Sequence, residues 1–405
     1  MKYSKRYPWV LVMLLWGVAL LNYMDRQMLS TMRPAMQQDI AELNSAASFG
    51  SLMAIFLWIY GLMSPVSGFV ADKLSKKWLI IVSLFVWSGV TYAMGYATTY
   101  SQILWLRALM GISEALYIPA GLALISSYHP PKTRSLAIGI HMTGLYTGQA
   151  LGGFGATIAA AFSWHATFHI LGFAGMVYAI VLILLLKDKN KEEREEYVIA
   201  NDNAASGENI LTLLLNISFW ILVFCFAITS LPGWAAKNWL PTLFSENLNL
   251  DMSHAGPAST ITIAASSFLG VIFGGILSDR WVQKNIKGRI YTSACGLAFT
   301  VPSLLLIALG HSAFNVIGAA FCFGFGYGMF DANNMPVLCQ FVPVKYRATA
   351  YGIMNMAGVF AGAFVTELLG RSTDEGNLGS SFAVLALILI VVITVQLFFL
   401  KPKVN

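Results

Sequence analysis

Charged residues are scarce in this chain. Only 11% of its 405 residues are Asp, Glu, Lys or Arg, whereas 57% are hydrophobic. That composition excludes a water-soluble globular protein. Long apolar stretches fill the chain instead, and a bilayer core of roughly 30 Å needs about 20 apolar residues per helix. The sequence therefore predicts an all-α protein that crosses a membrane many times.

Motifs for catalysis and for cofactor binding are also lacking. The sequence contains no nucleotide-binding loop and no Ser/His/Asp arrangement. Its four cysteines lie inside predicted helices without paired spacing, so we interpret them as small apolar residues rather than as a disulfide or metal set. We expect no enzyme activity, no metal and no cofactor. An ion gradient is then the expected energy source, with the proton as coupling ion.

Twelve apolar stretches are long enough to cross a membrane. They cover residues 9–32, 47–71, 78–98, 101–126, 135–161, 165–187, 211–240, 253–279, 290–310, 312–340, 346–369 and 378–400. An even number places both termini on one side, and most lysines and arginines fall on that side, which makes it cytoplasmic. The net charge of +6 therefore reflects topology and not nucleic acid binding. We expect a multi-pass protein of the inner (cytoplasmic) membrane, with the lipid bilayer as partner.

An internal repeat relates the two halves of the chain. Asp72 follows the second span in the run GFVADK, and Asp279 follows the eighth in GILSDR. Arg134 after the fourth span and Arg347 after the tenth each follow a proline and precede a glycine by five residues. We predict that these aspartates and arginines lock an inner gate at the helix ends.

The repeat also predicts the domain organisation. Six spans form an N-terminal bundle at residues 1–187, and six form a C-terminal bundle at 211–405. A charged, then Asn/Ala/Ser/Gly-rich segment at 188–210 is interpreted as a cytoplasmic linker. Parallel repeats of this kind place a substrate cavity between the bundles near the membrane midplane.

Two adjacent charges, Asp25 and Arg26, lie within the first span, where each costs about 2.5 to 3.5 kcal/mol. Neighbours on a helix point about 100° apart, so the two cannot pair well with each other. Arg26 shares a face with Asn22 and lies near Tyr23, which gives an edge suited to one anionic ligand. Asp25 points elsewhere and is free to pair with a cation such as Arg107. A static charge lattice between helices is the alternative for both residues.

The fourth span carries Arg107 and Glu114, which lie two turns apart on one face. At this depth desolvation favours the neutral carboxylic acid, whereas a nearby arginine favours the carboxylate, so Glu114 is suited to exchange a proton. We interpret Glu114 as a proton carrier and Arg107 as a structural organiser rather than a substrate contact.

The fifth span combines small and polar residues. Glycines stand four residues apart from Gly144 to Gly152, a stripe that lets helices pack closely. His141 and Gln149 share an adjacent face. They are candidates to line the cavity, and an interhelical hydrogen bond is the alternative for each.

The C-terminal half offers a second polar wall. Tyr327, Asp331 and Asn334 share one face of the tenth span, with Asn333 beside them, a pattern that predicts part of the cavity lining. We interpret Asp331 either as a third titrating group or as the partner of a basic residue.

Two further candidates lie on other helices of this half. Lys237 is the single lysine outside the predicted cytoplasmic set. It either extends to the outer interface or offers a second cation to a substrate carboxylate. Asn355 in the eleventh span is a candidate for binding substrate hydroxyls.

Two motifs resemble those of a known family. The run G-x-x-x-D-K-x-S-K-K at 68–77 is similar to the loop signature of the major facilitator superfamily, and R-A-L-M-G at 107–111 resembles its fourth-helix motif. The resemblance covers the full chain. It implies the major facilitator fold, in which two pseudo-symmetric six-helix bundles alternate access to a central site, and a functional monomer.

Within that superfamily, the runs N-Y-M-D-R at 22–26 and G-I-S-E-A at 111–115 are similar to the anion:cation symporters. These carry hexuronates, aldonates and sialic acid. The resemblance implies that Asp25 and Glu114 bind the coupled proton and that Arg26 meets the carboxylate of a small anionic substrate.

Alternative functions stay open at this point. Spinster-like lysolipid transporters have a very similar N-Y-M-D-R run, and a transporter-like nutrient sensor is a third possibility. Antiporters of the superfamily usually have a proline where Gln149 follows Gly148, and this departure favours symport. The sequence does not identify the acid that is carried.

Overall fold

The computed structural model describes residues 6–187, 214–310, 312–342, 346–400 and 402. The predicted linker at 188–210 lies outside the described residues. The first half forms α1 (Tyr7–Met36), η1 (Ala41–Asn44), α2 (Ala46–Lys73), α3 (Lys76–Met94), α4 (Tyr100–Ala115), α5 (Tyr117–Tyr128), α6 (Pro131–Gly152), α7 (Gly155–Ala161) and α8 (Trp164–Leu185). The second half forms α11 (Ile217–Leu248), α12 (Met252–Val282), α13 (Gly288–Leu309), α14 (Ala313–Asp331), α15 (Asn334–Leu338), α16 (Arg347–Asp374) and α17 (Leu378–Phe399).

The predicted all-α architecture is confirmed, since the described part of the chain contains no strand. Within that part, 11 helices are long and apolar enough to cross a membrane. The remaining predicted span, 135–161, corresponds to α6 and α7 and is not among them. Polar residues such as His141 and Gln149 occupy α6, so this helix depends on its neighbours for a place in the membrane.

Three predicted spans are interrupted where the sequence had indicated continuous helices. The fourth breaks at Leu116 between α4 and α5, the fifth after Gly152 between α6 and α7, and the tenth after Asp331 between α14 and α15. Pro119 and Pro336 stand in the first turn of α5 and α15, where a missing backbone N–H is tolerated. Discontinuous helices near the midplane are typical of binding sites in transport proteins.

The glycine stripe of α6 allows a close approach to α1. A β-carbon added at Gly144 would lie 2.7 Å from the carbonyl oxygen of Trp16, and one added at Gly152 would lie 2.8 Å from that of Met24. Any side chain larger than hydrogen would push the two helices apart. The prediction that this stripe serves packing is therefore confirmed.

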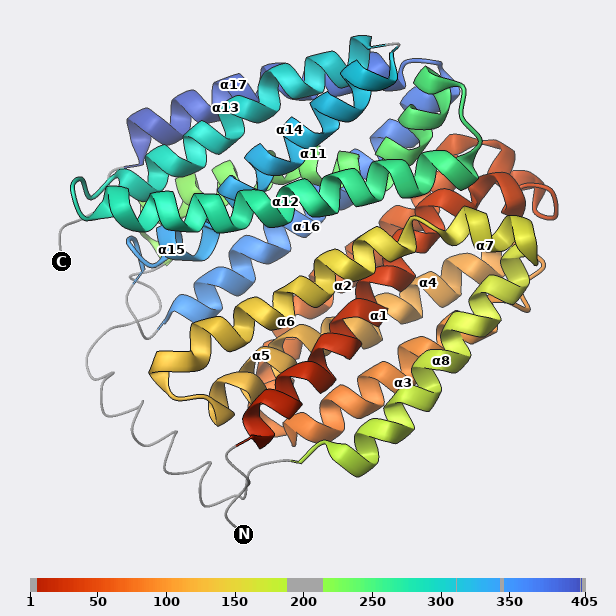
Figure 1. Ribbon diagram of the computed structural model, residues 1–405, viewed down its shortest axis with the longest axis horizontal. Helices are drawn as coiled ribbons and strands as arrows, with labels where there is room; N and C mark the ends of the chain where they lie inside the picture. The colour runs from red at the N-terminus through yellow and green to blue at the C-terminus, as the bar shows by residue number, and fades with distance from the viewer. Residues whose placement is uncertain (1–5, 188–213, 311, 343–345, 401, 403–405) are drawn as a thin grey trace.

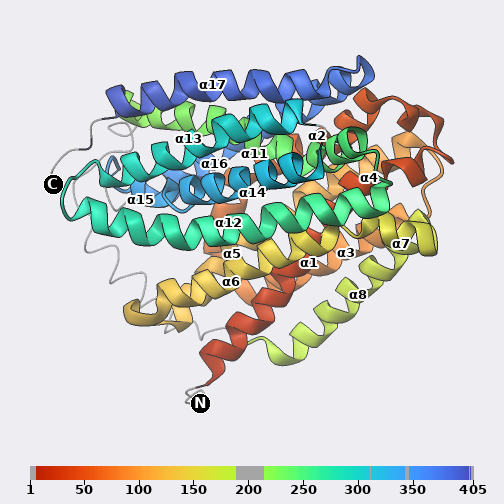
Figure 2. The same ribbon diagram turned by 45° about the horizontal axis from the view of Figure 1, so that its top comes forward.

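The two halves of the chain lie next to each other, one on each side of the long axis of the molecule. In Figure 1, α1 to α8 occupy the lower part and α11 to α17 the upper part. Between the halves, α2 packs against α16 and α6 packs against α12. Figure 2 shows the second pair side by side from another direction. These two helix pairs form the main contact between the bundles, and α1 and α7 also contact helices of the second half.

Asp374, the last residue of α16, joins the halves at the end where α2 begins. Its carboxylate accepts hydrogen bonds from the backbone N–H groups of Ala46 at 2.6 Å and Ala47 at 2.9 Å. The hydroxyl of Ser45 donates a third bond, at 2.7 Å. The N-terminus of a helix favours negative charge, so the carboxylate also complements the dipole of α2.

The start of α12 makes the second polar contact at this end. The Thr157 hydroxyl of α7 donates to the Ser253 carbonyl oxygen at 2.7 Å. The Thr260 hydroxyl donates to the Ala150 carbonyl oxygen of α6 at 3.1 Å. Together with Asp374, these bonds hold both helix pairs of the interface at one end of the molecule.

Replacing Asp374 with alanine is expected to loosen this end, because three donors lose a charged acceptor. Such bonds contribute roughly 1.5 to 3 kcal/mol each when buried and less at a partly exposed site. Spin labels at Gln38 and Ser380, measured by double electron–electron resonance in nanodiscs, should report a broader and longer distance distribution.

Glu375→Ala is the matched control for this measurement, since Glu375 is the next carboxylate along the chain and is exposed. It should leave the distribution unchanged. Identical distributions for Asp374→Ala and the unchanged protein would show that Asp374 does not hold this end together.

Candidate functional site

A cavity of about 380 Å³ lies between the two halves. Its volume is within the range of roughly 300 to 1,000 Å³ that is typical of small-molecule sites. Six of the residues that were predicted to bind substrate line it: Tyr23 of α1, Gln149 of α6, Lys237 of α11, Tyr327 and Asp331 of α14, and Asn334 of α15. The tertiary structure thus brings residues from five helices around one space.

Both charged residues on the cavity wall come from the C-terminal half. They are Lys237 and Asp331. The Asn334 amide donates a hydrogen bond to Asp331 Oδ1 at 3.0 Å. The Lys237 ammonium lies 4.8 Å from the ring centroid of Trp234 and 6.0 Å from that of Tyr23. Among the described residues, no direct ion pair joins the two charges.

A second group of charges is buried inside the N-terminal half. Arg26 Nε lies 2.6 Å from Glu114 Oε2, and the Asn22 amide donates to the same oxygen at 2.9 Å. The Glu114 side chain is 0% exposed and that of Arg26 is 12% exposed. The shared face of Asn22 and Arg26 does bind an anion, as the helical spacing indicated. In this structure that anion is the carboxylate of Glu114.

Aromatic rings enclose the Arg26 guanidinium. Its central carbon lies 5.2, 4.8 and 4.6 Å from the ring centroids of Tyr23, Phe56 and Tyr60 respectively. Arg26 does not line the cavity, whereas Tyr23 does. The ring of Tyr23 therefore contacts Arg26 within the bundle and Lys237 across the interface. Cation–π contacts of this kind strengthen when water is excluded.

Asp25 and Arg107 complete the buried group without pairing to each other. Asp25 Oδ2 accepts a hydrogen bond from the Thr91 hydroxyl at 3.3 Å. The Arg107 guanidinium lies 4.6 Å from the Phe56 ring centroid, and its Nη1 contacts the Met110 sulfur at 3.4 Å. Within the described part of the chain, the expected ion pair between Asp25 and Arg107 does not form.

Each buried carboxylate keeps one oxygen without a hydrogen-bond partner among the described residues. These atoms are Asp25 Oδ1 and Glu114 Oε1. Burying an ionised oxygen that accepts no hydrogen bond costs free energy in a medium of low dielectric constant. A proton on that oxygen removes the charge, so both carboxyl groups are suited to bind protons.

The other residues proposed for substrate binding lie away from the cavity wall. His141 is buried with its ring centroid 6.0 Å from that of Tyr117. Asn333 is buried, and its amide donates to the Met329 carbonyl oxygen at 2.8 Å. Asn355 is partly exposed and does not line the cavity.

The proposed gate residues are described only in part. Asp279 pairs with Arg289 at 3.6 Å. Arg347 donates to the carbonyl oxygens of Cys339 and Val342, which closes the turn after α15. The side chains of Asp72 and Arg134 lie outside the part of the structure that is described.

Three polar residues of the cavity wall were not predicted: Tyr146, Ser267 and Tyr351. Tyr146 stands three residues before Gln149 on α6, and this helical spacing could have identified it. Ser267 follows Ser266 directly, and Tyr351 stands four residues before Asn355, so a short polar pattern could have identified each of them.

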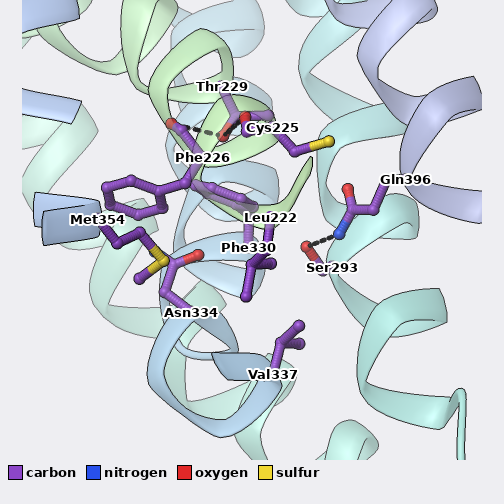
Figure 3. A pocket seen from close by; sticks show the side chains of 10 residues that line it. All are labelled: Leu222, Cys225, Phe226, Thr229, Ser293, Phe330, Asn334, Val337, Met354 and Gln396. Atoms are coloured by element: carbon purple, nitrogen blue, oxygen red, sulfur yellow. Dashed lines mark hydrogen bonds between the residues drawn. The ribbon is translucent and has the colours of Figure 1, made fainter. Parts of the chain in front are cut away.

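A smaller cavity of about 20 Å³ lies within the C-terminal bundle, and Figure 3 shows its lining. The Gln396 amide donates to the Ser293 hydroxyl at 2.9 Å on one side of it. Asn334 lines both this cavity and the larger one. Most of the other residues that line the smaller cavity are apolar.

The sequence matches the family described as Major Facilitator Superfamily over residues 15–366. A chloroplastic ascorbate transporter of Arabidopsis thaliana is 25% identical, over 98% of this chain and 75% of that protein. A hexuronate transporter of Bacillus subtilis is 25% identical, over 88% of this chain and 90% of that protein. A probable galactarate/D-glucarate transporter of the same species is 25% identical, over 88% of this chain and 89% of that protein.

Solved structures give the same fold. A bacterial homolog of the human lysosomal transporter Spinster, in an inward-facing and occupied conformation, superposes with a TM-score of 0.81. Its sequence is 18% identical, and the match covers 100% of both chains. The major facilitator fold that the motifs indicated is thus confirmed.

Replacing Glu114 with alanine is expected to lower the thermal stability markedly, because Arg26 and Asn22 would then be buried without their partner. Breaking a buried ion pair costs about 3 to 5 kcal/mol. Differential scanning fluorimetry of the purified protein in detergent measures the effect.

Glu367→Ala provides the comparison, since Glu367 pairs with Arg371 at 3.0 Å on an exposed face. Exposed pairs contribute about 0 to 1 kcal/mol, so the melting temperature should barely change. Equal shifts for the two variants would contradict the structural importance of the buried pair.

Proposed function

The chain belongs to the major facilitator superfamily, and from this premise we propose that it imports a carboxylated sugar together with protons. The substrate class comprises hexuronates, aldonates and sialic acid. The protein is a transporter of the membrane, and the proposal concerns its substrate and its coupling ion. One observation carries it: a cavity whose wall includes Lys237, which has no ion-pair partner among the described residues, lies beside the bundle that buries the carboxyl groups of Asp25 and Glu114.

The cavity lining favours a small polar acid. Lys237 supplies a cation for a carboxylate, and Gln149, Tyr327 and Asn334 supply partners for hydroxyl groups. Apolar residues such as Leu145, Ile263 and Phe323 also line the cavity, so the preference for a sugar acid over a lysolipid rests on the charged and amide side chains and not on a lack of apolar wall. The name of one bacterial relative, a hexuronate transporter, points to the same class. Another relative is named as a probable galactarate/D-glucarate transporter, and these substrates are sugar acids with two carboxylates.

Proton coupling follows from the Arg26–Glu114 pair. While Glu114 is ionised, its carboxylate holds the guanidinium. When Glu114 binds a proton, the pair loses its charge attraction and Arg26 becomes available for another anion. A substrate carboxylate that passes Tyr23 can then take the place of Glu114. Substrate and proton therefore enter the same cycle, which is symport by alternating access.

Asp25 is proposed as the second proton site. It lies next to Arg26 in the chain and is 4% exposed, with Thr91 as its one hydrogen-bond donor among the described residues. Protonation of Glu114 and then of Asp25 removes the negative charges of the cluster one at a time. The arginines then have no ionised partner within the cluster. Arg107, which is buried against Phe56, keeps its proposed structural role.

The orientation in the membrane is part of the proposal. The excess of lysine and arginine on the side of the termini supports a cytoplasmic position for both termini, and we propose the inner membrane as the location. The end that Asp374 holds together then faces outside, and the monomer moves as two bundles about the central cavity.

Purified protein in liposomes should accumulate labelled D-glucuronate when an inward proton gradient is applied. Glu114→Gln and Asp25→Asn are expected to lose this accumulation, because neither side chain can release a proton, while both keep exchange of labelled for unlabelled substrate. Uptake driven by a pH step, measured beside counterflow in the same vesicles, separates the two activities.

Competition by galacturonate, gluconate, sialic acid and a lysophospholipid identifies the substrate class. Inhibition by sugar acids supports the proposal, and inhibition by the lysophospholipid alone would replace it with lipid transport. Full accumulation in both acid variants would refute the assigned proton sites.

A further inference from the structure

The central cavity contains a negative charge as well as a positive one, although a site for an anion needs only the positive charge. Lys237 contributes one positive charge and Asp331 one negative charge, and the other residues on the wall are neutral. The two charges attract each other electrostatically but form no ion pair among the described residues. Each one therefore remains available to a ligand. A simple anion would use Lys237 and leave Asp331 facing its negative charge.

The position of Asp331 is well defined by its surroundings. It ends α14, immediately before the break in the tenth span, and its side chain is exposed to the cavity. The Asn334 amide donates to Oδ1 at 3.0 Å. Asn334 itself lines both the central cavity and the smaller one that Figure 3 shows. The hydrogen bond leaves Asp331 Oδ2 free toward the cavity.

A carboxylate held in this way discriminates between two kinds of acid. Its free lone pairs accept hydrogen bonds from neighbouring hydroxyl groups, and bonds to an ionised acceptor are the stronger ones. A second carboxylate has no proton to donate and is repelled by the negative charge. The difference between a terminal hydroxyl and a terminal carboxylate on the substrate thus becomes a difference in affinity.

We propose that Asp331, positioned by Asn334, binds the hydroxyl groups of the substrate and excludes a second carboxylate, so that the cavity selects polyhydroxylated acids with a single carboxylate. This inference rests on the proposed function and refines its substrate class. The carboxylate end binds toward Lys237 and the polyol end toward Asp331. Aldonates and hexuronates fit this pattern, whereas aldarates, with a carboxylate at each end, do not.

The test compares acids that share one carbon chain. D-Gluconate and D-glucuronate carry one carboxylate, and D-glucarate carries two. Uptake of each labelled acid into liposomes gives KM and kcat for the unchanged protein, for Asp331→Asn and for the surface control Glu367→Gln. Asparagine has the size of aspartate and keeps a hydrogen-bonding oxygen, but it lacks the charge.

For the unchanged protein and for Glu367→Gln, we expect kcat/KM to be about tenfold or more higher for the better of the two monocarboxylates than for D-glucarate. A difference of this size corresponds to one hydrogen bond to a charged group. Asp331→Asn should raise the KM for the monocarboxylate and lower that for D-glucarate, so that the preference falls or reverses. A gain of D-glucarate uptake cannot come from a misfolded protein.

Two further variants separate the roles of the neighbours. Lys237→Met should weaken the binding of monocarboxylates and of D-glucarate alike, because both kinds of acid place a carboxylate next to Lys237. Asn334→Ala should raise the KM for the monocarboxylate but keep the exclusion of D-glucarate, since Asp331 remains charged. A preference ratio that Asp331→Asn leaves unchanged would overturn the inference while the proposed function stands. Absence of uptake of every acid by the unchanged protein would overturn both.

Discussion

The buried ion pair between Arg26 and Glu114 is the interaction on which the rest of the site depends. An arginine within a membrane span needs an anion, and in this structure the anion is a carboxylate of the same bundle, 2.6 Å away and shielded by Phe56 and Tyr60. Because Arg26 is occupied, the cavity takes its positive charge from Lys237 on the opposite half. In the proposed mechanism, a substrate that reaches Arg26 has to compete with Glu114, and this competition links substrate binding to protonation.

The two halves of the protein therefore carry different parts of the chemistry. The N-terminal half holds two carboxyl groups and two arginines away from water, and the C-terminal half presents one charge of each sign to the cavity. Tyr23 contacts both groups, since its ring lies near Arg26 and near Lys237. The glycine stripe of α6 keeps this arrangement compact, because it lets the backbone of α1 approach where a larger residue would separate the helices.

Much of the architecture could be predicted from the sequence. Apolar length identified the spans, and helical spacing correctly placed Asn22 with Arg26 and Asp331 with Asn334. Spacing indicated most of the predicted residues of the cavity wall, and Lys237 was identified as the single lysine outside the predicted cytoplasmic set. These signals could not tell the wall residues from Arg26, His141 and Asn333, which are equally polar and lie off the wall. Ser267 and Tyr351 were missed although each has a polar neighbour, Ser266 before Ser267 and Asn355 one helical turn after Tyr351. The breaks after Ala115 and Asp331 were missed, although Pro119 and Pro336 mark both places and the second break lies within a polar run.

The sequence by itself determined that this protein is helical, lies in a membrane and carries polar groups on particular faces of its helices. Hydropathy and periodicity are properties of a single segment, so they can be read along the chain. Only the tertiary structure decided which anion Arg26 binds, that Asp25 meets Thr91 rather than Arg107, and that Lys237 and Asp331 share one cavity. These outcomes depend on the rotation and distance of helices that are far apart in the sequence. The packing of many side chains sets both, and no local pattern contains that information.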